Sequence, residues 1–168
     1  MQELHDSLRK AHDTAVGPDD IHYQILKHLP EISKLALLHI FNTIWINKQF
    51  PPCWREATVI PIPKPGKDHT NPTNYRPIAL TSCLCKTMER MVNNRLVYYL
   101  EHNAILTEYQ SGFRRHRSTI DQIIRLESVV REAFIKKEHT VAIFFDLERA
   151  YDATWKYGIM RDLHQAGL

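Results

Sequence analysis

Residues 141–152 read VAIFFDLERAYD, and this stretch decides what kind of fold the chain has. An apolar run leads directly into Asp146, and an aromatic residue, Tyr151, and a second carboxylate, Asp152, follow it. An apolar, β-rich run of this length predicts a buried strand over residues 141–145. A carboxylate at the end of such a strand reaches solvent from a rigid backbone. That position suits a divalent cation held over phosphate oxygens.

Each of these residues also has a plainer interpretation when it is taken alone. An aspartate at a strand end, such as Asp146, commonly accepts backbone hydrogen bonds in a turn. Tyr151 by itself is typical of a core aromatic residue, and Asp152 is typical of a helix cap. The functional interpretation therefore depends on the rest of the chain.

The composition is that of a globular protein with a basic middle. The chain has 168 residues, of which 43% are hydrophobic and 24% charged, and its net charge is +3. This composition excludes a disordered or fibrous protein and allows a sizeable core. Residues 51–120 carry ten Lys or Arg against five Asp or Glu, whereas the remainder carries twelve against fourteen. A basic middle favours a polyanionic partner, although a merely solvated basic surface has the same composition.

Cysteine usage and hydropathy bear on where the protein works. The three cysteines, Cys53, Cys83 and Cys85, form no disulfide framework, and an odd number indicates a reducing compartment. Cys83 and Cys85 lack the second pair of ligands that a zinc site requires. Residues 1–13 are polar and charged, and no apolar run has membrane-spanning length. We therefore expect a soluble intracellular protein, in the nucleus or cytoplasm, with no membrane attachment.

Helical and extended patterns alternate irregularly along the chain. In order, we expect a helical or frayed lead-in over 1–14, a helix ending near 28, helices over 31–48, 82–101, 119–137 and 155–165, and strands over 57–62, 75–80 and 141–145. Because this order lacks the regular alternation of parallel-sheet proteins, it predicts an α+β fold.

Three local patterns refine these expectations. Five apolar residues of the 31–48 segment recur at helical spacing and predict a core-facing side: Leu37, Ile40, Phe41, Ile44 and Trp45. Pro61 and Pro63 confine the first strand to a sheet edge. Thr119, with Gln122 three residues later, resembles a capping box at the start of a helix.

Two basic segments are candidates for binding anions. Lys64, Lys67 and Arg76 lie on or beside two short strands, so that a hairpin would project them over a phosphate-bearing ligand. The second segment, QSGFRRHRST at 110–119, combines a glycine that permits close approach, an aromatic stacking face and three arginines. It also precedes a predicted helix N-terminus, which favours anions. Solvated surface is the alternative for both segments.

Several motifs occur together in an order that carries a family resemblance. They are GPD at 17–19, FP at 50–51 with Trp54, VIPIPKPGK at 59–67, NYRPIAL at 74–80, Lys86 with Glu89 and Arg90, QSGFRRHRST at 110–119 and FDLERAYD at 145–152. Taken together, they resemble the reverse transcriptase of a non-LTR (LINE-like, Jockey-like) retrotransposon. Each motif is short, but their shared order over residues 16–168 makes the resemblance specific.

The resemblance implies a place in a right-hand polymerase. Residues 1–15 would be a lead-in, residues 16–138 the fingers subdomain, and residues 139–168 the start of the palm. Asp146 matches the first catalytic aspartate, which would bind both Mg²⁺ ions of a two-metal site together with the backbone carbonyl of Leu147.

The same resemblance implies contacts to nucleotide and template. Tyr151 matches the steric gate that disfavours a 2′-hydroxyl on the sugar. Lys64 and Arg76 match residues that hold the triphosphate of the incoming deoxynucleotide, with Lys67 as the alternative to Lys64. A segment near the template and nascent base pair corresponds to Gln110, Gly112, Phe113, Arg114 and Arg117. The implied partners are an RNA template, a DNA primer and deoxynucleoside triphosphates, and the oligomeric state is left open.

The later carboxylates of the family do not occur in these residues. No Asp–Asp pair follows Asp152, and Asp19-Asp20 lies in the wrong segment. We therefore expect the 168-residue chain by itself to be inactive, because the two-ion centre lacks most of its ligands. The alternative hypothesis is a non-catalytic remnant that keeps a nucleic-acid-binding surface. Without neighbouring strands, the 141–145 strand would expose an edge, so we also expect marginal stability and aggregation.

Overall fold

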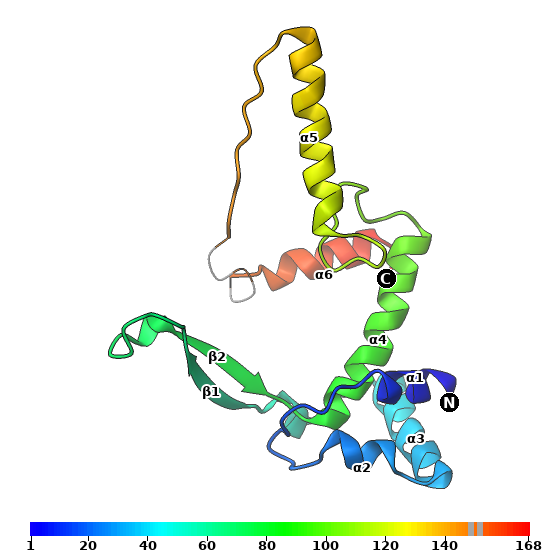
Figure 1. Ribbon diagram of the computed structural model, residues 1–168. Helices are drawn as coiled ribbons and strands as arrows, with labels where there is room; N and C mark the ends of the chain where they lie inside the picture. Colours follow the sequence, from blue (N-terminus) through cyan, green and yellow to red (C-terminus); the bar gives the residue numbers. More distant parts are fainter. Residues whose placement is uncertain (148–149, 151–152) are drawn as a thin grey trace. The chain divides into compact units, whose positions relative to one another are not determined.

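The computed structural model describes residues 1–147, 150 and 153–168 as two compact units. We call Met1–Tyr99 the N-terminal unit and Leu100–Leu168 the C-terminal unit, and we describe each by itself. Figure 1 shows the elements of both units. Helices are combined with a small antiparallel sheet, as expected for an α+β fold.

The N-terminal unit is built from four helices and a hairpin. Helices α1, α2 and α3 span Gln2–Arg9, Tyr23–Lys27 and Glu31–Asn47, a 3₁₀ turn spans Pro52–Arg55, and the unit takes in most of α4, Cys83–His102. Strands β1 (Thr58–Pro63) and β2 (Tyr75–Leu80) form the hairpin. The predicted helices and these two strands are confirmed to within a few residues.

The N-terminal lead-in is a core element of this unit. Leu4 and Leu8 on α1 are 0% and 3% exposed. Arg90 on α4 donates to the backbone oxygen of Ser7 at 2.6 Å. Arg95 and Glu3 form a two-pronged ion pair at 2.9 and 2.6 Å. The lead-in, which the sequence allowed to be frayed, therefore contains a packed helix, because α4 supplies both an apolar surface and cations for it.

Helix α3 buries only part of its predicted core-facing side. Leu37 and Phe41 are buried, and Phe41 meets the ring of Trp54 edge to face at 6.0 Å between centroids. Ile40 and Trp45, however, are 51% and 54% exposed. The prediction that all five apolar residues face a core is wrong for these two, because the core of this unit buries a narrower stripe of α3 than helical spacing predicts.

The hairpin stands out from the helices as a two-stranded sheet. Strands β1 and β2 pair antiparallel with Thr58 opposite Leu80 and Pro63 opposite Tyr75. All six residues of β1 are exposed, and Figure 1 shows the hairpin extending away from α2 and α3. In a sheet of two strands both strands are edges, so the prolines of β1 take the edge positions that the sequence predicts.

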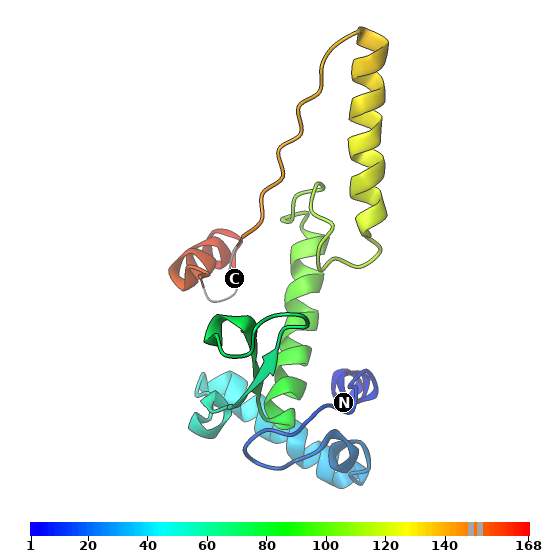
Figure 2. The same cartoon turned by 60° about the vertical axis from the view of Figure 1, so that its left-hand side comes forward.

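The C-terminal unit contains two helices, α5 (Thr119–Lys136) and α6 (Lys156–Gln165), and the long loop 103–118. Figure 2 shows the extended chain that follows α5.

The predicted capping box at the start of α5 is displaced by one residue. Ser118 is the cap of α5, and its backbone N–H donates to the Asp121 carboxylate at 2.6 Å. The prediction for Thr119 and Gln122 is wrong because Gln122 is engaged elsewhere.

The strand predicted over residues 141–145 does not form. This segment is extended but unpaired, and Phe144 and Phe145 are 82% and 88% exposed. A strand needs a neighbour to satisfy its N–H and C=O groups, and in the described residues no segment pairs with this one. The apolar run therefore predicted a strand whose partner these residues do not supply.

Two of the three cysteines are closed to solvent, which makes a testable prediction. Cys83 and Cys85 are 0% and 1% exposed, whereas Cys53 is exposed. Burial raises the pKa of both inner thiols, that of Cys85 to about 12, so their thiolate fraction is small at neutral pH. We expect Cys53 alone to react with a disulfide reagent in the folded chain, and all three thiols to react in denaturant.

The control for this measurement is Cys53→Ser, which should abolish the fast reaction. Rapid reaction of Cys83 or Cys85 in the folded chain would contradict the packing of α4.

In the part of the chain that the structure describes, no helix has the length and apolarity needed to cross a membrane.

Candidate functional site

The hairpin places two residues that are predicted to bind phosphate on one of its faces. Arg76 lies opposite Ile62 in the register, and the backbone N–H of Lys64 continues the ladder by donating to Asn74 at 2.8 Å. Side chains alternate between the two faces of a strand. Lys64 is two residues beyond Ile62 and therefore shares its face with Arg76.

The hairpin loop is held by its own polar groups. Asp68 accepts from the backbone N–H of Thr70 at 2.9 Å and from its hydroxyl at 2.7 Å, and these bonds lower the pKa of the carboxyl. Asn74 donates to the backbone oxygen of Asp68 at 2.8 Å, and the Lys64 ammonium donates to that of Thr73 at 3.0 Å. One of the three N–H donors of the Lys64 ammonium therefore helps to close the loop. Exposed Lys67 lies within the same loop.

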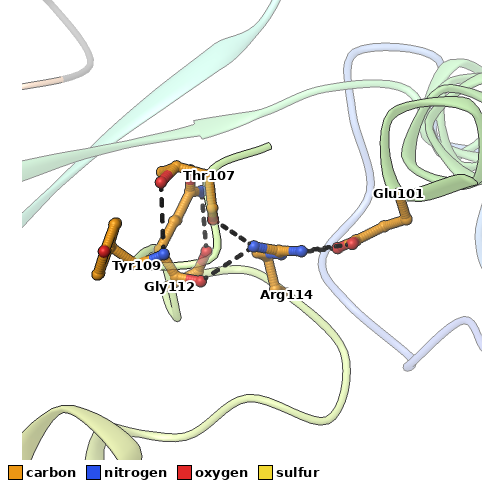
Figure 3. Close-up of polar contacts among 6 residues, drawn as sticks. Glu101, Thr107, Tyr109, Gly112 and Arg114 are labelled. Atoms are coloured by element: carbon orange, nitrogen blue, oxygen red, sulfur yellow. Dashed lines mark hydrogen bonds and ion pairs between the residues drawn. The ribbon is translucent and has the colours of Figure 1, made fainter. Parts of the chain in front are cut away.

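Loop 103–118 carries the second predicted segment, and Arg114 lies at its centre. Figure 3 shows the Arg114 guanidinium between the Glu101 carboxylate and the carbonyls of the loop. Nε and Nη2 donate to the two Glu101 oxygens at 2.8 and 2.6 Å, and Nη1 donates to the oxygen of Thr107 at 2.6 Å. A longer bond of 3.4 Å joins Nη1 to the oxygen of Gln110.

The pKa values of Glu101 and Arg114 are shifted in the directions expected of a close ion pair. Hydrogen bonds from Arg114, followed by the charges of Arg114 and Arg117, hold the pKa of the Glu101 carboxyl below its ordinary value. The Arg114 pKa is raised for the reciprocal reason. The Arg114 side chain is only 10% exposed, although it belongs to a surface loop.

Helix α5 holds the same loop from its other side. The Gln122 amide donates to the backbone oxygen of Tyr109 at 2.9 Å and to the Ser111 hydroxyl at 2.5 Å. The Arg125 guanidinium lies 4.5 Å from the centre of the Tyr109 ring. Sequence reasoning assigned Gln122 to a cap and gave no role to Glu101 or Arg125. No local signal marks Glu101, because its partner is thirteen residues away.

The tip of this loop presents an aromatic ring to solvent. Phe113 is 94% exposed and has φ of +60°, a conformation that costs a bulky residue energy. Gly112 has open space around its missing Cβ, so nothing in the described residues requires a glycine there. That space remains free for an incoming group. Arg115 and Arg117 follow Phe113 in sequence and are exposed.

Asp146 and Leu147 lie at the end of the unpaired segment. Both are exposed, and Tyr151 and Asp152 lie outside the described residues. Within the described residues, no group of three His, Cys, Asp or Glu side chains could hold a metal ion. A two-metal centre needs several oxygen ligands, so the described residues do not fit such a centre by themselves.

The N-terminal unit also contains an apolar groove of about 610 Å³ between α3 and α4. Its lining is Ile44, Trp45, Lys48, Phe50, Met88, Glu89, Val92, Asn93 and Leu96. None of the predicted site residues lines this groove.

Comparison with protein families identifies one that matches most of the chain. The family described as "Reverse transcriptase (RNA-dependent DNA polymerase)" matches residues 62–168. The matched region begins in β1 and contains loop 103–118 and Asp146.

Three curated proteins of Drosophila melanogaster are similar to this chain. A probable RNA-directed DNA polymerase from transposon BS is 39% identical over 144 residues, which are 86% of this chain and 16% of that protein. One from transposon X-element is 33% identical over 158 residues, 94% of this chain and 17% of that protein. The RNA-directed DNA polymerase from mobile element jockey is 34% identical over 146 residues, 87% of this chain and 16% of that protein.

These matches settle the family to which the sequence is related. The chain spans about one sixth of the length of the curated relatives, which are named as polymerases of transposable elements. The family match and the identities agree with the order of the short motifs in the sequence. The chain belongs to the reverse transcriptase (RNA-dependent DNA polymerase) family.

Proposed function

We propose that this chain is the nucleotide- and template-binding portion of an RNA-directed DNA polymerase of a non-LTR retrotransposon. Residues 16–138 would be its fingers and residues 139–168 the start of its palm. The parent reaction joins a deoxynucleotide to the 3′-hydroxyl of a DNA primer on an RNA template. The observation that carries the proposal is the family match, which covers the second basic segment and Asp146 together.

Charge and geometry support a role for the hairpin in binding the triphosphate. Half-buried Lys64 and exposed Arg76 share one face of the hairpin, and exposed Lys67 lies in the turn beyond them. An arginine offers a planar fork to phosphate oxygens and a lysine a movable point charge. Because the Lys64 ammonium also holds the loop closed, Lys67 is the more available lysine for the triphosphate.

Asp146 is the proposed catalytic residue, with the Leu147 carbonyl as a further metal ligand. Mg²⁺, when bound in the complete polymerase, would neutralise the charge that develops on the transferred phosphate. The described residues supply one carboxylate to that centre, so no step through the ions is assigned to them. Tyr151, the proposed sugar gate, would act beside the same carboxylate. By themselves, the 168 residues should therefore bind nucleic acid without extending a primer.

This expectation is tested with the 168-residue chain and a DNA primer annealed to an RNA template. We expect binding whose affinity falls as salt rises, and no extension when deoxynucleotides and Mg²⁺ are added. Arg117→Gln should reduce the slope of log affinity against log salt by about 1, because one contact to a nucleic-acid phosphate is lost. Binding is followed by fluorescence anisotropy and extension by gel electrophoresis.

The outcomes separate the two hypotheses for this chain. Salt-dependent binding without extension supports the nucleic-acid-binding segment. Extension that disappears in Asp146→Asn but persists in Asp162→Asn, an exposed aspartate of α6, would show that the 168 residues are catalytic. Absence of any binding would overturn the proposed role of the basic segments.

A further inference from the structure

We propose that Glu101, Arg114 and Gln122 form a brace that holds Phe113 ready to stack on an unpaired base of single-stranded RNA. In this proposal Arg114 is a positioning residue, and it makes no phosphate contact. The inference rests on the nucleic-acid binding proposed above and adds roles for Glu101 and Gln122.

Arg114 has little left to offer a phosphate. Three of its nitrogens already donate, two of them to both oxygens of one carboxylate in the fork geometry that an incoming phosphate would need. Its side chain is 10% exposed. Moving the guanidinium to a phosphate would break the Glu101 pair and the 2.6 Å bond to the Thr107 carbonyl. Replacing the Glu101 carboxylate by a phosphate as the partner of Arg114 would therefore add little binding free energy.

The contacts fix the loop at points on both sides of its tip. Arg114 ties the carbonyls of Thr107 and Gln110 to the end of α4. Gln122 ties Tyr109 and Ser111 to the first turns of α5. The segment that leads into Phe113 is therefore anchored at Thr107, Tyr109, Gln110 and Ser111.

A second set of contacts supports the same arrangement. The Gln110 amide donates to the carbonyl of Gly112 at 3.2 Å, and Arg125 lies under the Tyr109 ring. Tyr109 and Gln110 thus use their side chains within the unit. Phe113, in contrast, is 94% exposed on a backbone of positive φ. Strain of this kind persists only where surrounding contacts impose it, and it is concentrated at functional sites.

The chemistry of the tip favours a single strand as the ligand. An exposed aromatic ring can stack only on a base whose face is not already covered, as in unpaired RNA. Arg117, four residues after Phe113 in the same loop, is exposed and can neutralise a phosphate of that strand. Gly112 leaves open space for the backbone of the strand to approach.

The removal of one negative charge distinguishes this proposal from a direct phosphate contact. If Arg114 held a phosphate, Glu101→Gln would release it and tighten binding. If Arg114 is a positioning residue, Glu101→Gln loosens the brace and weakens binding by about tenfold, the low end of what one base stack contributes. Glu108→Gln is the matched control, because it removes the same charge from an exposed position in the same loop. It should leave binding unchanged or slightly tighter.

The probe is a fluorescein-labelled, unstructured single-stranded RNA of about twelve nucleotides, within the site sizes of single-strand binding folds. Arg114→Lys keeps the charge but loses the fork, so it should weaken binding as much as Arg114→Gln does. Neither variant should change the slope of log affinity against log salt. In a Phe113→Ala background, which itself binds about tenfold more weakly, Glu101→Gln should have no further effect.

Amide hydrogen exchange of residues 107–114 in the unliganded chain tests the brace without RNA. Exchange should accelerate in Glu101→Gln and not in Glu108→Gln, while the circular dichroism of both variants stays that of the parent. Unchanged exchange, tighter RNA binding by Glu101→Gln, or a salt slope reduced by Arg114→Gln would each overturn the inference. Failure of the parent chain to bind RNA would overturn the proposed function and the stacking role together, whereas the exchange result alone decides the brace.

Discussion

Gly17→Ala is expected to lower the free energy of unfolding of the N-terminal unit by about 3 kcal/mol, the upper part of the range for overpacking a filled site. A Cβ at this position would lie 2.4 Å from the backbone nitrogen of Ser82 and 2.5 Å from the carbonyl carbon of Thr81. These are backbone atoms at the start of α4, where the Ser82 hydroxyl accepts from the N–H of Leu84 at 3.2 Å. They cannot rotate out of the way as a flexible side chain would.

The measurement is urea denaturation followed by tryptophan fluorescence, because Trp54 is 9% exposed in the core of this unit. Gly112→Ala is the matched control. Its added Cβ would meet no atom within 4 Å and its φ is ordinary, so its stability should change by less than about 0.5 kcal/mol. Equal stability of the Gly17→Ala variant and the parent would show that Gly17 does not pack against the backbone of Thr81 and Ser82 as described.

Leu4→Ala is expected to destabilise the same unit by about 3 kcal/mol, within the range for removing a buried leucine. Leu4 is fully buried on α1. Its loss would leave a cavity that the neighbouring helix cannot fill, because Arg90 and Arg95 hold α1 in place through Ser7 and Glu3. Both the lost transfer free energy and the cavity contribute to the cost.

Leu35→Ala is the control for this substitution. Leu35 lies in α3 and is 53% exposed, so the same change there should cost less than about 0.5 kcal/mol. Thermal and urea denaturation of both variants provide the comparison. Equal destabilisation by the two variants would mean that α1 is frayed in solution, as the polar sequence of its first residues allowed.

The local elements were predictable because their signals are local. Helical spacing placed α3 and α4, a capping pattern placed α5, and short extended runs placed both strands of the hairpin within a residue or two. The strand over 141–145 was not predictable in the same way. Its apolar residues favour an extended chain, but pairing depends on a second strand, and in the described residues none lies beside it.

The candidate site shows the same division between local and distant information. A glycine, an aromatic residue and a row of arginines marked residues 110–119 as a nucleic-acid contact. The sequence treated those arginines alike. The fold distinguishes them, because Glu101 from the end of α4 takes the Arg114 guanidinium while Arg117 stays exposed. A partner thirteen residues away leaves no periodic signal.

By itself, the sequence determined the family, the order of the elements and the chemical types at each motif, because these depend on residue identity and short-range spacing. Only the tertiary structure decided that α1 is a core helix, that Gly17 is required for close approach to α4, and that Arg114 is a brace while Phe113 is presented to solvent. Each of these depends on which distant groups meet. Burial and ion pairing depend on the contact between distant residues, and neither residue's identity alone determines them.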